Sequence, residues 1–401
     1  MRLDNTIKQK HFFSSRFKWN LQPNRLSLLL EEKRRRDEKV FDLTESNPTA
    51  AGFDYPAEAI LHALAQPAAL RYEPQPRGLL SAREAVAEYY RQRGHDVNVD
   101  RIHLTTGTSE AYTFLFKLLA DSGQNVLVPQ PSYPLFDFLA GFEGIELVPY
   151  RLFYAQDEWR IDFDSIYAAI NEQTRAIILV NPNNPTGSFV KRDELANLTR
   201  LYAEHRLPLI VDEVFSDYAF SPDSTRVESL VGVSEPLTFV MSGLSKILGL
   251  PQMKLGWIVV NGPENSCRQA QEYLDLLADT QLSVSTPIQH AAPKWLQFKD
   301  ILQNQISARV KANFNFLQTQ LVDHPRCRAL RAEGGWYAVL EIDKLSSEEE
   351  FILAVLKNDN VLVHPGYFFD FQTEGFLVLS LLPAPEIFRE GFGRLLQQIS
   401  I

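Results

Sequence analysis

The chain contains few cysteines and no long apolar run. Its two cysteines, Cys267 and Cys327, stand far apart and in no CxxC or Cys/His spacing, so the sequence predicts neither a disulfide framework nor a zinc site. No segment approaches the roughly 18 to 20 consecutive apolar residues that a membrane-spanning helix needs. The amino-terminal stretch also lacks an apolar segment of signal-peptide length and carries Asp4. We therefore expect no membrane partner and a cytoplasmic protein, with a transit peptide as the alternative.

An excess of positive charge is also missing. The 401 residues include 40 lysines and arginines against 50 aspartates and glutamates, which gives a formal net charge of −10. The densest charge run, Glu31 to Lys39, mixes both signs and is typical of the solvated part of a helix. An anionic surface of this kind argues against a nucleic-acid partner.

The composition is that of an ordinary globular protein. Hydrophobic residues make up 45% of the chain and charged residues 22%. A chain of 401 residues is too long for one simple core, because single cores stop growing at about 250 to 300 residues. These values predict one large domain and a smaller one.

Strand-like and helical patterns alternate through the middle of the chain. Apolar runs such as NVLV, AIILV, LPLIV and LTFVM fit strands that are buried on both faces. Helical patterns such as SEAYTFLFKLLADSG and RDELANLTRLYAEH lie between them. The sequence therefore predicts an α/β fold, with a large three-layer domain around a mostly parallel sheet and a smaller α/β domain. We divide the chain into an amino-terminal arm that contributes to the small domain (1–45), a large domain (46–287) and a small carboxy-terminal domain (288–401).

Four unusual residues each follow one of the strand-like runs: Tyr133, Asn184, Asp212 and Lys246. Ligands of such sheets bind beyond the carboxyl ends of the strands, so four residues at this edge predict a site. Taken alone, each is also typical of an ordinary turn, a packing contact or a surface position. Lys246 stands out because a lysine among apolar groups loses its charge more readily and becomes nucleophilic.

A set of ordered motifs resembles a known family, the class I/II aminotransferases among the fold-type I pyridoxal-phosphate enzymes. The resemblance runs from about Asp42 to the carboxyl terminus and is carried by LRYEPQPRG, TTGTSEA, PSYP, NPNNPTG, VDEVF, SGLSKILGLPQMKLGW and EGGW. The order of NPNNPTG, DE and SK is its most specific part. The resemblance implies pyridoxal 5′-phosphate as the cofactor of the large domain, an amino donor and a 2-oxo acid as substrates, and a homodimer with shared active sites.

The same resemblance implies the chemical roles of three residues. Lys246 would form a Schiff base with the cofactor aldehyde and, once displaced by substrate, would move a proton between the substrate and the cofactor. Asp212 would face the pyridine nitrogen and keep it protonated, so that the ring accepts electrons. Asn184, in a turn held by Pro182 and Pro185, would donate a hydrogen bond to the phenolic oxygen.

The phosphate contacts are also implied by the resemblance. Gly107, Thr108 and Ser109 stand where a strand-like piece meets a helix, and the free N–H groups of a helix start suit a phosphate. Ser or Thr at this place is equally an ordinary helix cap. Lys254 stands where the family commonly has a phosphate-binding arginine. Lysine keeps the charge but loses the planar two-point grip, so we expect looser cofactor binding.

Two aromatic residues complete the implied cofactor site. Tyr133 would stack its ring on the cofactor. Tyr72 matches the tyrosine that reaches the phosphate of the neighbouring subunit, and the stretch Ser283–Pro287 would approach the same phosphate. These contacts are the reason for expecting at least a dimer.

Several positions depart from the family pattern. Gly243 replaces a common hydroxyl residue three positions before Lys246, and Phe215 replaces a tyrosine that donates to the phenolic oxygen. In the segment GFLVLSLL, Val378 stands where the family carries the arginine that pairs with the substrate carboxylate. Three explanations stay open: Arg77 or Arg16 makes that contact, the substrate is not an ordinary α-amino acid, or the segment aligns a few residues away.

The sequence thus predicts a pyridoxal-phosphate-dependent aminotransferase that uses Lys246 to move an amino group between an amino donor and a 2-oxo acid. The first alternative is another fold-type I enzyme, a β-lyase or a decarboxylase, that acts on an atypical substrate. The second is a non-catalytic cofactor-binding protein or regulator. Regulators of this fold usually carry an added DNA-binding domain, and the residues before Asp42 are too few for one. The sequence names neither the donor nor the acceptor.

Overall fold

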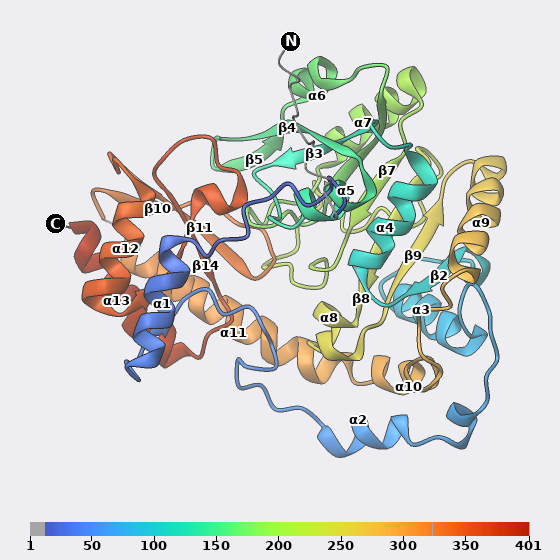
Figure 1. The fold of residues 1–401 in the computed structure, drawn as a ribbon, viewed down its shortest axis with the longest axis horizontal. Coiled ribbons are helices and arrows are strands. Elements are labelled where there is room, and N and C mark those ends of the chain that lie inside the picture. The colour runs from blue at the N-terminus through green and yellow to red at the C-terminus, as the bar shows by residue number, and fades with distance from the viewer. Residues whose placement is uncertain (1–12, 323, 401) are drawn as a thin grey trace, which may run out of the picture.

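The computed structural model describes residues 13–322 and 324–400. It contains a larger and a smaller body of helices and strands, and the long helix α11 (Lys299–Leu321) runs from one toward the other (Figure 1). The predicted α/β fold with two unequal parts is confirmed. The amino-terminal residues on which the expectation about a signal sequence rests lie largely outside the described residues.

The large part is built on one sheet of eight strands in the order β2-β9-β8-β7-β6-β3-β4-β5. The pairs β3–β4, β3–β6, β6–β7 and β7–β8 are parallel, whereas β9 is antiparallel to both neighbours and β5 forms a hairpin with β4. The sheet is therefore mostly parallel, as predicted, and the carboxyl ends of its parallel strands share one edge. Its strands are β2 (Ile102–Thr105), β3 (Asn125–Gln130), β4 (Glu146–Ala155), β5 (Glu158–Ile161), β6 (Thr174–Val180), β7 (Leu209–Asp212), β8 (Thr238–Gly243) and β9 (Gly256–Asn261).

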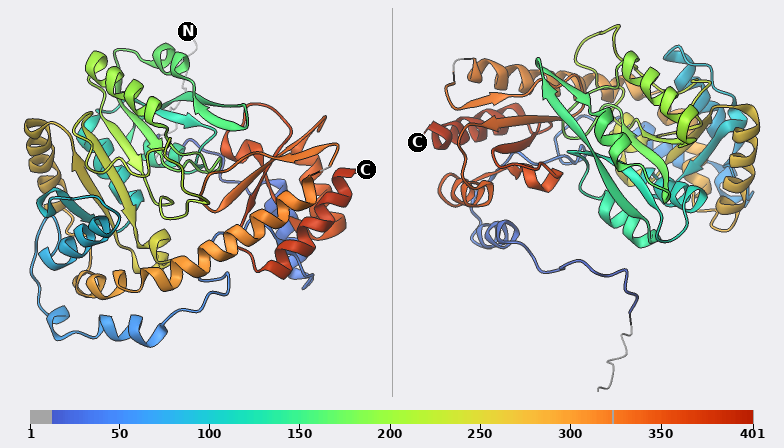
Figure 2. Two further views of the ribbon diagram at one scale, coloured as in Figure 1. Left: turned by 180° about the vertical axis from the view of Figure 1, so that it is seen from behind. Right: turned by 90° about the horizontal axis from the view of Figure 1, so that it is seen from above.

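Helices cover both faces of this sheet and make the three layers (Figure 2). Side chains of α4, α5 and α9 pack on one face, and those of α3, α6, α7 and α10 pack on the other. The strands carry apolar residues on both faces because both faces are covered. The helices and 3-10 turns are α2 (Ala57–Leu64), η1 (Pro67–Leu70), α3 (Leu80–Gln92), η2 (Val99–Arg101), α4 (Thr108–Leu119), α5 (Phe136–Glu143), α6 (Phe163–Ala169), α7 (Arg192–His205), α8 (Leu244–Ile247), η3 (Pro251–Met253), α9 (Glu264–Asp279) and α10 (Thr286–Leu296).

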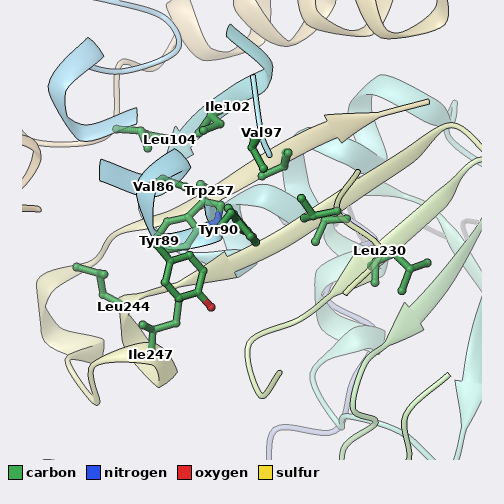
Figure 3. Packing of buried hydrophobic residues seen from close by; sticks show 14 of the residues in the cluster. Val86, Tyr89, Tyr90, Val97, Ile102, Leu104, Leu230, Leu244, Ile247 and Trp257 are labelled. Atoms are coloured by element: carbon green, nitrogen blue, oxygen red, sulfur yellow. Dashed lines mark hydrogen bonds between the residues drawn. The ribbon is translucent and has the colours of Figure 1, made fainter. Parts of the chain in front are cut away.

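An aromatic cluster anchors the short helix α8 to the sheet. Tyr89, Tyr90 and Trp257 pack edge to face, with ring centroids 5.0 to 6.5 Å apart, and the Trp257 indole donates a hydrogen bond to the Tyr90 hydroxyl at 3.0 Å. Leu244 and Ile247 of α8 belong to the same buried core (Figure 3). Leu244 precedes Lys246 by two positions and Ile247 follows it directly, so their burial in this core fixes the backbone that carries the lysine.

The small part contains a four-stranded antiparallel sheet in the order β10-β11-β14-β13 and a short parallel pair, β1–β12. The helix α1 and the strand β1 of the amino-terminal segment pack on this part through α12 and β12. Its elements are α1 (Arg25–Arg35), β1 (Phe41–Asp42), β10 (Cys327–Ala329), β11 (Tyr337–Ile342), α12 (Glu348–Asp359), β12 (Val361–Leu362), β13 (His364–Pro365), η4 (Gly366–Phe369), β14 (Phe376–Ser380) and α13 (Pro385–Ser400).

The predicted boundary after residue 287 stays a prediction, but the core changes later in the chain. Helix α10 packs on α2 and α3, and its Trp295 donates a hydrogen bond to the Ile60 carbonyl at 3.0 Å. Leu302 still belongs to the core of the large part, whereas Ile306 belongs to that of the small part. The division between the two cores therefore lies inside α11.

Cys267 and Cys327 are free and buried. Within the described ranges, no helix is long and apolar enough to cross a membrane. The same residues contain no group of three or more His, Cys, Asp or Glu side chains that could hold a metal ion.

Candidate active site

The carboxyl edge of the sheet brings the sequence-predicted residues together. Asp212 ends β7, Lys246 follows β8, and Asn184 follows β6. Tyr133 follows β3, and Gly107 lies between β2 and α4. Because these strands run parallel, their turns all open at the same edge.

Lys246 lies half-buried beside two aromatic rings. Its Nζ is 5.0 Å from the centroid of Trp336 and 5.5 Å from that of Phe215. Burial lowers the pKa of the Lys246 ammonium to about 8, and the nearby Asp212 carboxylate partly opposes this shift. A substantial fraction of the amine is therefore neutral near physiological pH, which is the form that attacks a carbonyl.

Asp212 is buried, and its carboxylate acts on Lys246 by raising the pKa of the ammonium. Its Oδ1 accepts a hydrogen bond from the Val214 N–H at 3.1 Å, and its Oδ2 accepts one from the Tyr112 hydroxyl at 3.3 Å. Burial raises the pKa of Asp212 to about 6, against the effect of these donors and of Lys246. A carboxylate so placed can hold a proton on a basic nitrogen that approaches it.

The start of α4 offers a place for an anion. Gly107 caps the helix, and Thr108 and Ser109 form its first turn. The Nζ of Lys254 lies 3.9 Å from the position that a Cβ on Gly107 would occupy. A helix start, two hydroxyl residues and an ammonium at one point suit a phosphate.

Glycine is required where the strands meet this helix. A Cβ on Gly243 would lie 2.8 Å from the Leu255 carbonyl oxygen and 3.0 Å from the Gly256 Cα, and a Cβ on Gly256 would lie 2.9 Å from the Gly107 Cα. The hydroxyl residue that the family carries at position 243 does not fit this backbone. The neighbouring Ser242 has a buried Oγ that finds no hydrogen-bond partner among the described residues.

Asn184 and Tyr133 follow the neighbouring strands β6 and β3 at the same edge of the sheet. Asn184 is buried, and its Oδ1 has no partner within the described part of the chain. Both Asn181–Pro182 and Asn184–Pro185 are cis peptide bonds. Burial raises the pKa of Tyr133 to about 12, with Tyr337 and Asp212 adding to the shift.

The structure adds residues that sequence reasoning missed. Trp336, from the EGGW motif, is fully buried against Phe215 at 5.3 Å and leaves its indole N–H without a described partner. Tyr112 bonds Asp212, and Tyr337 lies 6.2 Å from Phe215. The EGGW motif was visible in the sequence, but an aromatic residue in a glycine turn is typical of simple packing.

Tyr72 lies apart from this cluster. It is 75% exposed, and it lines one pocket together with Ser283, Val284 and Thr286. Ser283 is tied to the first turn of α4, because Glu110 accepts hydrogen bonds from the Ser283 hydroxyl at 2.8 Å and from the Thr106 N–H at 2.7 Å. The two sequence segments expected near a neighbouring phosphate thus lie together.

The arginines considered for a substrate carboxylate are not brought to the site. The Arg77 guanidinium is held by both oxygens of Asp275, at 2.7 and 2.6 Å, and by the Asp100 carbonyl. Arg16 lies in the exposed amino-terminal segment, where its N–H donates to Ser14. Val378 is fully buried in β14.

These residues fit pyridoxal 5′-phosphate in three respects. Lys246 supplies an amine that is easily neutral, Asp212 an acid for the ring nitrogen, and the start of α4 with Lys254 a phosphate site. In addition, the buried Oδ1 of Asn184 and the buried indole N–H of Trp336 have no hydrogen-bond partner among the described residues. Buried polar atoms are normally hydrogen-bonded, so such orphans are expected where a polar ligand binds.

Comparisons with known proteins agree with this interpretation. A family model described as aminotransferase class I and II matches residues 38–387. The glutamate-pyruvate aminotransferase AlaA of Escherichia coli K12 is 29% identical over 366 residues, which cover 89% of this chain and 90% of that protein. The alanine aminotransferase of Pyrococcus furiosus superposes with a TM-score of 0.84 at 29% identity, over 94% of this chain and 96% of that one. An aminotransferase from Escherichia coli gives a TM-score of 0.83 at 27% identity, over 97% and 98% of the chains.

The family match spans most of the chain, and the relatives cover nearly its whole length in sequence and in fold. The chain therefore belongs to the class I and II aminotransferase family and is a fold-type I, pyridoxal-phosphate-dependent transaminase.

Proposed function

We propose that the protein transfers an amino group from an amino donor to a 2-oxo acid, with Lys246 as the residue that binds the cofactor and moves the proton. The observation that carries this proposal is the Lys246 amine, with its pKa lowered to about 8, beside the buried Asp212. The cofactor, when bound, supplies the ring that accepts the electron pair of the substrate's C–H bond. Glutamate, alanine and pyruvate, which the names of the relatives mention, are the first compounds to test.

Each remaining residue then has one task. Once the substrate has displaced it, Lys246 takes the proton from the amino-bearing carbon of the donor and passes it to the cofactor. It can do so because the displaced amine is neutral. Asp212 keeps a proton on the ring nitrogen. Lys254 and the first turn of α4, with Gly107, Thr108 and Ser109, hold the phosphate.

The cofactor site also needs Asn184 and Tyr133 in this proposal. Asn184 donates a hydrogen bond to the phenolic oxygen, and Tyr133 packs on the ring. Phe215 stands where a hydroxyl donor is common, so Asn184 is the principal protein donor to that oxygen. This arrangement is supported by the burial of Asn184.

We propose further that the active form is a homodimer and that it works in the cytoplasm. The exposed Tyr72 and its pocket with Ser283 support a contact with the neighbouring subunit's phosphate site. The free thiols of Cys267 and Cys327 are consistent with a reducing compartment. Mixing Tyr72→Phe with Lys246→Ala tests the dimer, because a mixed dimer regains one complete site, and mixing that restores no activity contradicts shared sites.

The absorbance spectrum of the protein with pyridoxal phosphate tests the central assignment. We expect a band of lysine-bound cofactor that Lys246→Ala abolishes and that Lys344→Ala, at an exposed position, leaves unchanged. An amino donor should convert this band to that of the amine form, and a 2-oxo acid should restore it. If no band forms with the unaltered protein, the assignment of Lys246 is wrong.

Elimination or decarboxylation by the same fold is the second candidate, which Phe215 in place of the usual hydroxyl donor leaves open. Those reactions need no amino acceptor. If product forms with catalytic turnover in the absence of any 2-oxo acid, this second candidate replaces transamination.

A further inference from the structure

The sheet face that carries Val378 is apolar. Along β14, Leu377 and Leu379 point into the core of the small part, whereas Val378 lies in a separate buried cluster whose other members are Trp159, Leu330, Val339 and Phe369. Val378 is 0% exposed. A shift of alignment by one residue would place a core leucine there, so an apolar residue stands at this height in either case.

This face continues from the reactive lysine through a series of aromatic rings. Lys246 Nζ lies 5.5 Å from the Phe215 ring, which lies 6.2 Å from the Tyr337 ring, which lies 6.2 Å from the Phe369 ring. Phe369 then packs with Val378. These contacts link Lys246 to the cluster that contains Val378, the position where the resemblance places the contact with a substrate carboxylate. We call the apolar side chains of this cluster the wall.

No cation of this chain segment reaches the wall. Between Lys357 and Arg389 the sequence has no lysine or arginine at all, so no misalignment by a few residues supplies one. Three arginines near the cluster are held by acids: Arg151 by Asp162, Arg160 by Asp193 and Arg328 by Glu341. Arg331, which follows Leu330, is exposed. A guanidinium already paired with a carboxylate gains little by turning to a second one.

His364 is a titratable side chain beside Val378. It pairs with Val378 across β13 and β14 and lies 5.8 Å from the Phe369 ring. Burial lowers the pKa of His364, and the Asp42 carboxylate only partly opposes this. The imidazole is therefore neutral at physiological pH, and the formal charge nearest to it is the negative one of Asp42.

A carboxylate is stable in a buried site only when a cation or several hydrogen-bond donors replace its water. We propose that the natural amino donor carries an uncharged group, and not a carboxylate, on the carbon that bears its amino group. This inference rests on the proposed transamination and names the substrate class of the same site: a primary amine with an alkyl, aryl, hydroxymethyl or carboxamide substituent.

The reaction balances with a 2-oxo acid as acceptor. The donor loses its amino group and the hydrogen of the same carbon and gains a carbonyl oxygen, and the 2-oxo acid gains the amino group and a hydrogen as it loses its carbonyl oxygen. The two electrons that leave the donor reduce the acceptor, so no other oxidant is needed. The acceptor carboxylate meets the same wall, so we expect a high KM for 2-oxo acids.

Matched donors test the proposal on the unaltered holoenzyme. L-phenylalanine is compared with L-phenylalaninol and L-phenylalaninamide, and L-leucine with L-leucinol, by single-turnover conversion of the cofactor band. We expect the uncharged member of each set to react about 10- to 100-fold faster, the factor that a charged hydrogen-bonded contact is worth. Amino acids that react faster than their matched alcohols overturn the inference and leave transamination intact. If no donor changes the band, the proposed function fails, and the inference fails with it.

Binding supplies a readout that does not depend on turnover. Calorimetry with 3-phenylpropanoate and 3-phenylpropanamide should show tighter binding of the amide to the holoenzyme. Val378→Arg should reverse this order and speed the return half-reaction with 2-oxo acids, whereas Val378→Met, which changes volume without charge, should not. Unaltered protein that binds the carboxylate more tightly overturns the proposal even if Val378→Arg does not fold.

Discussion

A buried ion pair holds the loop that carries Trp336 to the site, and its removal should be costly. Lys191 is 2% exposed and Glu333 is 9% exposed. Lys191 Nζ contacts both carboxylate oxygens of Glu333, at 2.5 Å for Oε1, and the Phe189 N–H donates to Oε2 at 2.9 Å. In Lys191→Met the Glu333 carboxylate stays buried with one backbone donor, and such broken pairs cost about 3–5 kcal/mol.

The double variant Lys191→Met/Glu333→Gln isolates the cause of that loss. The glutamine oxygen still accepts from the Phe189 N–H, but it carries no charge that needs a partner. Replacing a whole buried pair is often nearly neutral, so we expect the double variant to lie within about 1–2 kcal/mol of the unaltered protein. The exposed Lys344→Met, which should change the free energy of unfolding by less than about 0.5 kcal/mol, is the control.

Urea unfolding of the cofactor-free protein, followed by tryptophan fluorescence, measures these differences. The loop is also tied by its backbone, since the Glu333 N–H donates to the Gly187 carbonyl at 3.1 Å and its carbonyl accepts from Phe220 at 2.9 Å. The single variant should therefore also slow cofactor capture, because Trp336 lies 5.0 Å from Lys246 Nζ. A loss below about 1 kcal/mol in Lys191→Met, or a double variant no more stable than the single one, refutes the reasoning.

Three further predictions concern the cofactor site. The rate of pyridoxal-phosphate capture by the cofactor-free protein should rise with pH and level off above about 8, where the Lys246 amine becomes neutral. A midpoint near the ordinary lysine pKa, measured by stopped-flow absorbance, contradicts this. Asp212→Asn should keep the cofactor, lower turnover by about 10²–10³-fold and move that midpoint to lower pH, because the carboxylate raises the lysine pKa; an unchanged midpoint contradicts the coupling. Lys254→Arg should lower the Kd for pyridoxal phosphate, measured by equilibrium dialysis, and leave that for phosphate-free pyridoxal unchanged.

The fold was predictable because the pattern that specifies it is local. Runs such as Ala176 to Val180 are apolar without alternation, and the structure buries both of their faces. The position of α10 was not predictable in the same way. Its contacts with α2 and α3, including the bond from Trp295 to Ile60, join residues that are far apart in sequence. An amphipathic helix shows that it has a buried face but not which core covers it.

The same difference between local patterns and long-range contacts applies to the candidate site. Lys246, Asp212 and Asn184 could be predicted because each is an unusual residue after a strand, and strand ends converge by topology alone. Trp336 and Tyr112 could not, because an aromatic residue in a helix or a turn is most often core, and only the contacts with Lys246 and Asp212 distinguish them. The apolar wall at Val378 needed both sources: the sequence shows the missing charge, and the structure shows that Arg151, Arg160 and Arg328 near it are paired with acids.

Gly243 shows why a family pattern alone does not fix a residue's tolerance to change. By resemblance, Gly243→Ser restores a common hydroxyl and should tighten phosphate binding. The structure predicts the reverse, because the new Cβ would lie 2.8 Å from the Leu255 carbonyl oxygen and 3.0 Å from the Gly256 Cα. Both are backbone atoms, and Gly256 is the first residue of the paired strand β9. Overpacking of this kind costs about 1–3 kcal/mol, and the shift of Gly256 would move Gly107, which lies against it at the start of α4. We therefore expect Gly243→Ser to unfold at a lower urea concentration and to bind pyridoxal phosphate more weakly. A variant with tighter binding and unchanged stability would show that the strand ends move apart to accommodate the side chain.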